Sequence, residues 1–142
     1  MVDKKERMRH FAKTFKDCGD WDPRYWGYFI TFNESRFYEA HDILEDLWLE
    51  CRRMPLDAFY KSLIQLAGAF VHLEKKRYRP AGALFKLCQG YLRPYGDSCE
   101  GLALGEIHDL IDCWADHTAF AQVDGPCLLE CFEKPSLQMP GA

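Results

Sequence analysis

The sequence predicts an all-α protein, folded as a single compact helical bundle of four to five helices. Apolar residues recur every three to four positions through much of the chain, which is the spacing of one helix face. No segment shows the strict alternation of apolar and polar residues that a half-buried strand requires. The 142 residues are enough for one hydrophobic core and predict one domain, 1–142.

Composition and charge exclude several classes of protein. The formal net charge of -4 gives no basic surface for phosphates, so we expect no nucleic-acid partner. No apolar run reaches the roughly 18 residues that span a bilayer, and the N-terminus MVDKKERMRH lacks the apolar stretch of a signal peptide. The seven cysteines are irregularly spaced, which favours free thiols in a reducing compartment. We therefore expect a cytoplasmic protein that is not secreted and has no membrane partner.

The first segment of the chain, 1–20, is predicted to hold an N-terminal helix, running from Asp3 to Lys16. The next segment, Trp21 to Phe32, is dense in aromatic residues. Pro23 and Gly27 interrupt it, so we expect an irregular or short helical segment that lies over the core.

The segment from Phe32 to Arg52 predicts an amphipathic helix, with Asn33 as its N-cap. At about 100° per residue, its apolar side carries Phe37, His41, Leu44, Trp48 and Cys51. The opposite side carries Glu39, Asp42, Asp46 and Glu50, which are expected to be a solvated face. Glu45 lies at the border, four residues after His41, so the two side chains are neighbours on the helix surface.

A second helix is predicted from Pro55 to Lys76, antiparallel to the first and joined to it by a short turn at Met54. Apolar residues cover so much of its surface that we expect it to be the most buried helix. Its remaining side carries Gln65, Gly68, Ala69 and His72, where two small residues allow another helix to come close.

Two further helices are predicted, Ala81 to Tyr95 and Glu106 to His117. Gly96 ends the former, and Ser98 to Gly105 is expected to be a loop. These helices complete a core that spans residues 32–118. Proline and glycine after Val123 predict an extended tail, 123–142.

One polar cluster is the strongest candidate site, and it is assembled from the two central helices. Its members are Glu39, His41, Glu45, Gln65 and His72, with Trp48 as the nearby aromatic residue. As a structural feature, it would be a network in which His41 bonds Glu45 and Gln65 bonds His72. As a metal site, the two histidines and Glu45 would form a facial triad for a divalent metal.

The class of function is predicted from which catalytic and ligand-binding motifs the sequence contains. The sequence shows no recognisable nucleophile motif, phosphate loop or metal motif, which favours a non-catalytic binding or protein-interaction module without a cofactor. The aromatic segment Trp21 to Phe32 is the surface expected to meet a protein partner or a second copy of the chain. The alternative is a metal-dependent hydrolase or oxygenase that uses His41, Glu45 and His72.

From Phe32 to about Tyr95 the chain resembles a small all-helical family of bacteria, archaea and plastids, domain-of-unknown-function family 309. The family pattern F-N-x-G-x-F/Y-x-E-A-H-E-x-L-E-x-x-W is matched at Phe32, Asn33, Phe37 or Tyr38, Glu39, Ala40, His41, Leu44, Glu45 and Trp48. A second block, L-I-Q-L-A-x-A-x-x-H, is matched from Leu63 to His72. Ser35 replaces the usual glycine and Asp42 the usual glutamate. The resemblance implies a helical bundle, adds the plastid stroma as a possible location and implies no activity.

Overall fold

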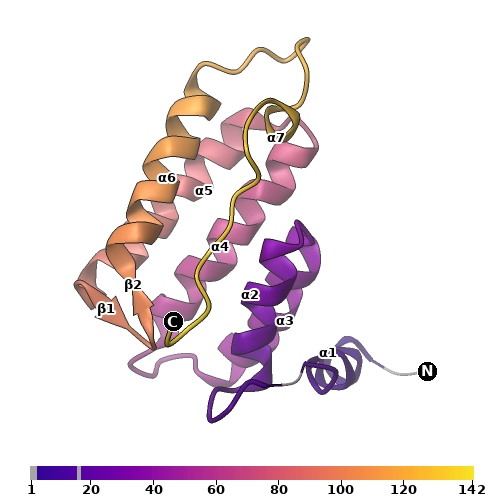
Figure 1. Ribbon diagram of the computed structural model, residues 1–142, viewed down its shortest axis with the longest axis vertical. Helices are drawn as coiled ribbons and strands as arrows, with labels where there is room; N and C mark the ends of the chain where they lie inside the picture. Colours follow the sequence, from indigo (N-terminus) through magenta and orange to yellow (C-terminus); the bar gives the residue numbers. More distant parts are fainter. Residues whose placement is uncertain (1–2, 16) are drawn as a thin grey trace.

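A computed structural model describes residues 3–15 and 17–142 of the chain (Figure 1). Within these ranges it contains seven α-helices, one short 3₁₀-helix and one two-stranded hairpin. The helices are α1 (Lys4–Ala12), α2 (Pro23–Asn33), α3 (Phe37–Glu50), α4 (Asp57–Glu74), α5 (Tyr78–Leu92), α6 (Leu104–Ala119) and α7 (Leu128–Cys131). The 3₁₀-helix is η1 (Arg93–Tyr95), and the antiparallel strands are β1 (Ser98–Cys99) and β2 (Leu102–Ala103).

The all-α class is confirmed, but the predicted count of four to five helices is wrong. Pro23 does not interrupt the aromatic segment, because it stands in the first turn of α2, where a missing N–H costs nothing. The Asp22 carboxylate caps this helix by accepting a hydrogen bond from the Arg24 backbone N–H at 2.8 Å. Gly27 is buried inside α2, where a Cβ would clash with the ring of Phe15. This glycine therefore allows a close contact and does not break the helix. The predicted helix end at Lys16 lies outside the described residues.

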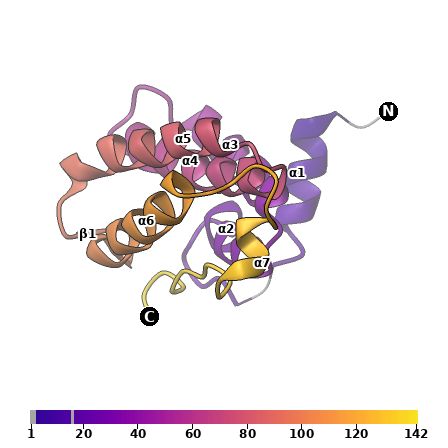
Figure 2. The same ribbon diagram turned by 90° about the horizontal axis from the view of Figure 1, so that it is seen from above.

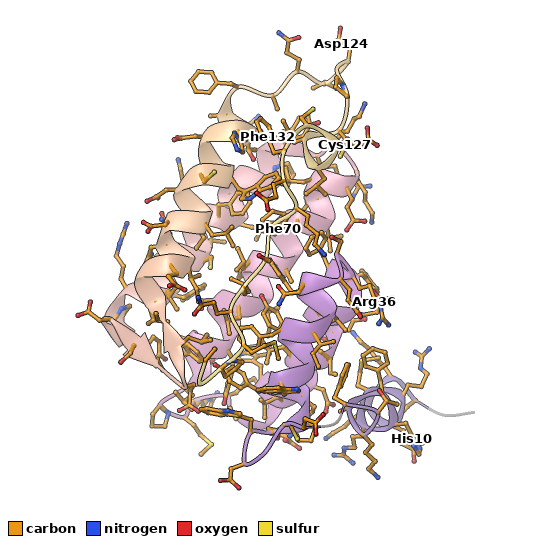
Figure 3. All side chains as sticks on the ribbon, in the orientation of Figure 1. His10, Arg36, Phe70, Asp124, Cys127 and Phe132 are labelled. Carbon is orange, nitrogen blue, oxygen red and sulfur yellow. The ribbon has the colours of Figure 1, made fainter. Side chains whose placement is uncertain are left out.

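The centre of the bundle is α4, which packs against α3 on one side and α5 on the other. Seen from above, α3, α4 and α5 form one row, with α2 and α6 in front of it (Figure 2). Phe70 of α4 lies in the middle of the molecule (Figure 3). Its ring contacts the rings of Phe32, Phe37, Phe85 and Trp114 at centroid distances of 5.1 to 5.5 Å. One side chain thus joins α2, α3, α5 and α6 around α4.

The predicted N-cap role of Asn33 is wrong, because this residue ends α2 and α3 begins four residues later. Its side-chain amide instead holds the C-terminal tail. Asn33 Nδ2 donates to Leu137 O at 2.8 Å, and Leu137 N donates to Asn33 Oδ1 at 2.7 Å. The turn between α2 and α3 places Ser35 at a φ of 61°, a left-handed conformation that favours glycine. A glycine at this position, as in the pattern that the sequence resembles, would adopt this conformation without strain.

The tail returns along the front of the bundle, between α2 and α6 (Figure 1). It begins with α7, and its last residues reach the hairpin, where Gly141 N donates to Gly101 O at 2.8 Å. The segment predicted as a loop from Ser98 to Gly105 contains this hairpin and the first turn of α6. In the part of the chain that the structure describes, no helix is long and apolar enough to cross a membrane.

Candidate binding face on helix α4

His41 and Glu45 lie one turn apart on α3, but each contacts a different neighbour. His41 Nδ1 lies 3.1 Å from Asp42 Oδ1, and Glu45 Oε1 accepts a hydrogen bond from Lys4 Nζ of α1 at 3.2 Å. Glu39 lies farther toward the start of α3, with one oxygen 3.9 Å from Arg36 Nε. The hydrogen bond expected between His41 and Glu45 does not form between these described residues.

The two polar side chains expected on α4 are also not bonded to each other. Gln65 and His72 are both half-buried, and in residues 3–15 and 17–142 neither side chain has a hydrogen-bond partner. His72 Nδ1 is fully buried. Burial, followed by the nearby charges of Arg77 and Lys75, lowers the pKa of His72 below its ordinary value of 6.5. The imidazole is therefore neutral at pH 7.

The proposed metal triad is not assembled in this conformation. Among the residues whose structure is described, no group of three or more His, Cys, Asp or Glu side chains could hold a metal ion. The Glu45 carboxylate is instead paired with Lys4 at the edge of α1. The structure brings His41 against α4, but it does not bring Glu45 and His72 to a common point with it.

The acidic side of α3 is only half the solvated face that the sequence predicts: the side chains of Glu39 and Glu50 are 46% and 41% exposed, but Asp42 and Asp46 are buried. Asp42 and Asp46 are 8% and 4% exposed, because α1 and α2 cover them. Lys4 Nζ lies 3.4 Å from Asp42 Oδ1. Arg24 Nη1 donates to Asp46 Oδ2 at 2.8 Å, and Arg24 Nη2 donates to Glu50 Oε2 at 2.7 Å. This buried charge network fixes α2 on α3, and sequence reasoning missed Arg24 because the arginine belongs to another helix.

A continuous half-buried stripe runs along α4, formed by Lys61, Gln65, Gly68 and His72. The spacing of three or four residues keeps these positions on one side of the helix. At Gly68, a Cβ would lie 3.3 Å from Leu84 Cδ1 of α5 and 3.8 Å from His41 Cδ2 of α3. The two flanking helices therefore come close to each other over this glycine, as expected for a small residue.

Two turns along α4 from Gly68, Lys61 bridges the same two flanking helices. Its Nζ lies 5.9 Å from the ring centroid of Trp48 on α3 and 5.0 Å from that of Tyr91 on α5. Both distances are within the range of a cation–π interaction. The ammonium group thus lies between two aromatic rings that come from opposite sides of α4.

Trp48 is held in place by the connection between α3 and α4. Its Nε1 donates to Asp57 Oδ1 at 2.7 Å, and the backbone N–H of Arg53 donates to Asp57 Oδ2 at 2.7 Å. The Arg53 hydrogen bond, and then the Trp48 hydrogen bond, lower the pKa of Asp57 below its ordinary value of 3.8. Because both carboxylate oxygens are occupied, Asp57 positions the indole ring at the end of the stripe.

We call the resulting surface the α4 face. It consists of His41, Trp48, Lys61, Gln65, Gly68, His72, Leu84 and Tyr91. The face offers one ammonium group, two aromatic rings and several hydrogen-bonding groups, all on three helices that pack tightly together. A rigid surface of this composition is suited to bind a partner that has an acidic group among apolar ones.

Most aromatic rings of the segment Trp21 to Phe32, in contrast, lie in the core. Tyr25, Tyr28, Phe29 and Phe32 are at most 1% exposed. The Tyr28 hydroxyl donates to Leu63 O at 2.6 Å, and the Tyr25 hydroxyl donates to Glu100 O at 2.8 Å. For these four residues the prediction was wrong, because the segment forms a regular helix that places their rings on the side facing the core. Trp21 and Trp26 are half-buried, and for them a partner contact stays a prediction.

Comparison with known proteins gives one match. Residues 25–84 match a family model with the description Domain of unknown function (DUF309). The matched range contains α2 from its third residue on, all of α3 and α4, and the first half of α5, and so includes every member of the α4 face except Tyr91. No curated protein and no solved structure matches the chain.

Proposed function

Residues 25–84 belong to the DUF309 family, and from this premise we propose that the domain is a non-catalytic binding module that recognises a protein partner through the α4 face. The recognised segment carries a carboxylate flanked by apolar side chains. A carboxylate would pair with Lys61, and the apolar neighbours would pack on the rings of Trp48 and Tyr91.

The observation that carries this proposal is the position of the Lys61 ammonium group. It lies between two aromatic rings and forms no ion pair with any carboxylate in the described part of the chain. The neighbouring Asp57 is already used by Trp48 and by the Arg53 backbone. A half-buried cation beside apolar rings gains more from an incoming carboxylate than a fully solvated one, because less water screens the pair.

The rest of the face supports binding of an extended or helical protein segment. Leu87, one turn before Tyr91 on α5, is 45% exposed and extends the apolar surface beyond Leu84. Tryptophan and tyrosine are the residues most often found at the energetic centre of protein interfaces. Within residues 3–15 and 17–142, His41 Nε2 and the Gln65 amide have no hydrogen-bond partner, so they could orient the partner's main chain.

A binding role accounts for these side chains better than a metal-dependent hydrolase or oxygenase does. A catalytic metal requires its ligands to converge on one point with an open position for water or substrate. Here Glu45 pairs with Lys4, and His41 lies against Asp42 and Gly68. The α4 face supports recognition without any rearrangement of these contacts.

The proposal is tested with a random peptide library selected against the purified protein. We expect the enriched peptides to share an aspartate or glutamate next to apolar residues, and their binding to perturb amide resonances of α4 around Lys61. Lys61→Glu should abolish binding. Lys86→Glu, which changes an exposed lysine on a different side of α5, is the matched control and should leave it intact. Peptides without a shared acidic residue, or binding that survives Lys61→Glu, would refute the proposal.

A further inference from the structure

A second surface lies between α5 and α6, away from the α4 face. It is an open groove of about 480 Å³, lined largely by small residues: Gly82 and Ala83 from α5, and Ala115, Thr118 and Ala119 from α6. At the end of α6, Phe120 is 85% exposed. Small side chains allow a neighbouring helix to approach closely, and a large exposed ring beside them adds apolar surface that water hydrates poorly.

The two edges of this groove carry opposite charges. On the α5 side, Arg79 and Lys86 line the groove and are exposed. On the α6 side, the exposed Asp112 and Asp116 each stand three residues before a lining alanine, Ala115 or Ala119, which places them along the α6 edge. Within the described ranges, Lys86 and Asp116 take part in no ion pair. Both charges are therefore available to a neighbouring molecule.

The relative position of the two helices follows from two contacts. A Cβ on Gly82 would lie 4.0 Å from Thr118 Cγ2, and Gln89 Nε2 donates to Asp112 Oδ1 at 2.7 Å. Residue numbers thus increase along α5 as they decrease along α6, so the helices are antiparallel. Lys86 lies midway between these two contacts along the helix axis, at the height of the α6 segment that carries Asp112 and Asp116.

We propose that the α5–α6 groove is the interface of a symmetric dimer, and that its occupant is the same groove of a second copy of this chain. A two-fold axis that runs along the groove, parallel to the helices, places α5 of one copy over α6 of the other. The rotation leaves each residue at the same height along the axis. Lys86 of each copy then faces Asp116 of the other. Because the symmetry generates this contact twice, one groove with a basic and an acidic edge is complementary to itself.

The charge pattern favours a second copy over an unrelated partner. A groove that served one foreign helix would need only the charges opposite to those of that helix, whereas here both signs line the two edges of the same groove. The inference does not depend on the α4 face, because Lys86 and Asp116 belong to a different side of the molecule. Either surface can therefore fail without the other.

Sedimentation velocity over a concentration series tests the dimer with two charge-reversal variants, Lys86→Glu and Asp116→Lys. We expect the wild-type chain to dimerise and each variant alone to need an at least about tenfold higher concentration, because two like-charge contacts then face each other. An equal mixture of the two variants should dimerise again, since one native and one inverted pair form across the axis. Circular dichroism melting curves check that both variants fold.

Three outcomes would overturn the proposal. One is a wild-type chain that stays monomeric into the millimolar range. The second is a dimer that both single variants leave unchanged, which would move the interface to another surface. The third is a mixture that associates no better than its components, which would contradict the symmetric pairing. Lys61→Glu is the matched control on the α4 face and should leave dimerisation unaffected.

Discussion

Removal of the Arg24 side chain should be one of the most damaging single changes to the fold. The side chains of Arg24 and Asp46 are 13% and 3% exposed, and the 2.8 Å contact between them is the ion pair that compensates the buried carboxylate. Arg24→Met keeps most of the side-chain volume but leaves Asp46 buried without its cation. Breaking a buried pair in this way typically costs 3–5 kcal/mol, and we expect about 3 kcal/mol here because the guanidinium is partly exposed.

Urea unfolding followed by circular dichroism measures this loss. With a slope of about 2 kcal/mol per molar for a domain of this size, the midpoint should fall by about 1.5 M. Arg36→Met is the matched control, because its 3.1 Å pair with Glu34 is 42% and 54% exposed and should contribute less than about 1 kcal/mol. The double variant Arg24→Met/Asp46→Leu should regain part of the stability, since no buried charge remains.

The effect should also depend on pH in a defined direction. Burial alone would raise the pKa of Asp22, but hydrogen bonds from Arg24 outweigh it and hold that pKa below 3.8. A hydrogen bond from Arg24 likewise lowers the pKa of Glu50 below 4.5. The two carboxylates therefore stabilise the fold fully when the pH is above their ordinary pKa values of 3.8 and 4.5. This stabilisation is lost as the pH falls through the lowered pKa values that they have in the folded protein. The difference between wild type and Arg24→Met should shrink below about pH 4.5.

The reasoning would be refuted by an Arg24→Met variant that loses less than about 1 kcal/mol at pH 7, the range of an exposed pair. It would also be refuted by a difference that grows on acidification. Either result would mean that the network on α3 is solvated in solution, as the sequence alone suggests.

Three further predictions concern other parts of the chain. The pKa of His72 is lowered in the fold, so neutral His72 is compatible with the folded state above pH 6.5, and stability is lost as the pH falls through the folded pKa. In His72→Gln, the urea midpoint should therefore fall less steeply below pH 6.5 than in the wild type. Asn33→Ala removes the two hydrogen bonds to Leu137, so it should lower the free energy of unfolding by about 1–2 kcal/mol and speed amide hydrogen exchange in residues 134–142. Unchanged exchange there would contradict the role of Asn33 in holding the tail. Burial raises the pKa of Cys88 to about 12, so maleimide should label the exposed Cys113 in the folded protein and Cys88 only after unfolding, as read by mass spectrometry.

The central helices could be predicted from sequence because their periodicity is long and uninterrupted. The helix predicted from Pro55 to Lys76 is observed as α4 (Asp57–Glu74), packed against α3 as expected. That α5 is its neighbour on the other side was not predicted. Burial of Phe59, Leu63, Leu66, Phe70 and Leu73 follows directly from their spacing. Such a pattern is set by the helix itself and needs no information about distant residues.

Helix α2 could not be predicted in the same way, because whether Pro23 and Gly27 interrupt a helix depends on their position in it and on what packs against them. Proline is compatible with a helix when it stands in the first turn, and the cap at Asp22 shows that it does. Gly27 leaves the space that the ring of Phe15, twelve residues earlier in the chain, occupies against α2. A local pattern cannot reveal a contact between two separate segments.

The candidate site shows the same limit at the level of single side chains. The spacing places His41 and Glu45 on adjacent turns, but the partner that each selects depends on α1 and on the neighbouring aspartate. Three members of the α4 stripe, Gln65, Gly68 and His72, were predicted to share one side of the helix, but Lys61 was missed. Its contact with Trp48 becomes apparent only when α3 and α4 are paired in their observed register.

The most direct test of the central claim is a charge exchange measured by isothermal titration calorimetry. A peptide selected on the wild-type protein is remade with lysine in place of its acidic residue and titrated against wild type and Lys61→Glu. If the carboxylate binds at Lys61, the original peptide binds only wild type, and the remade peptide binds only Lys61→Glu. Failure of the remade peptide to bind Lys61→Glu, while the original peptide still binds both proteins, would contradict recognition through the α4 face.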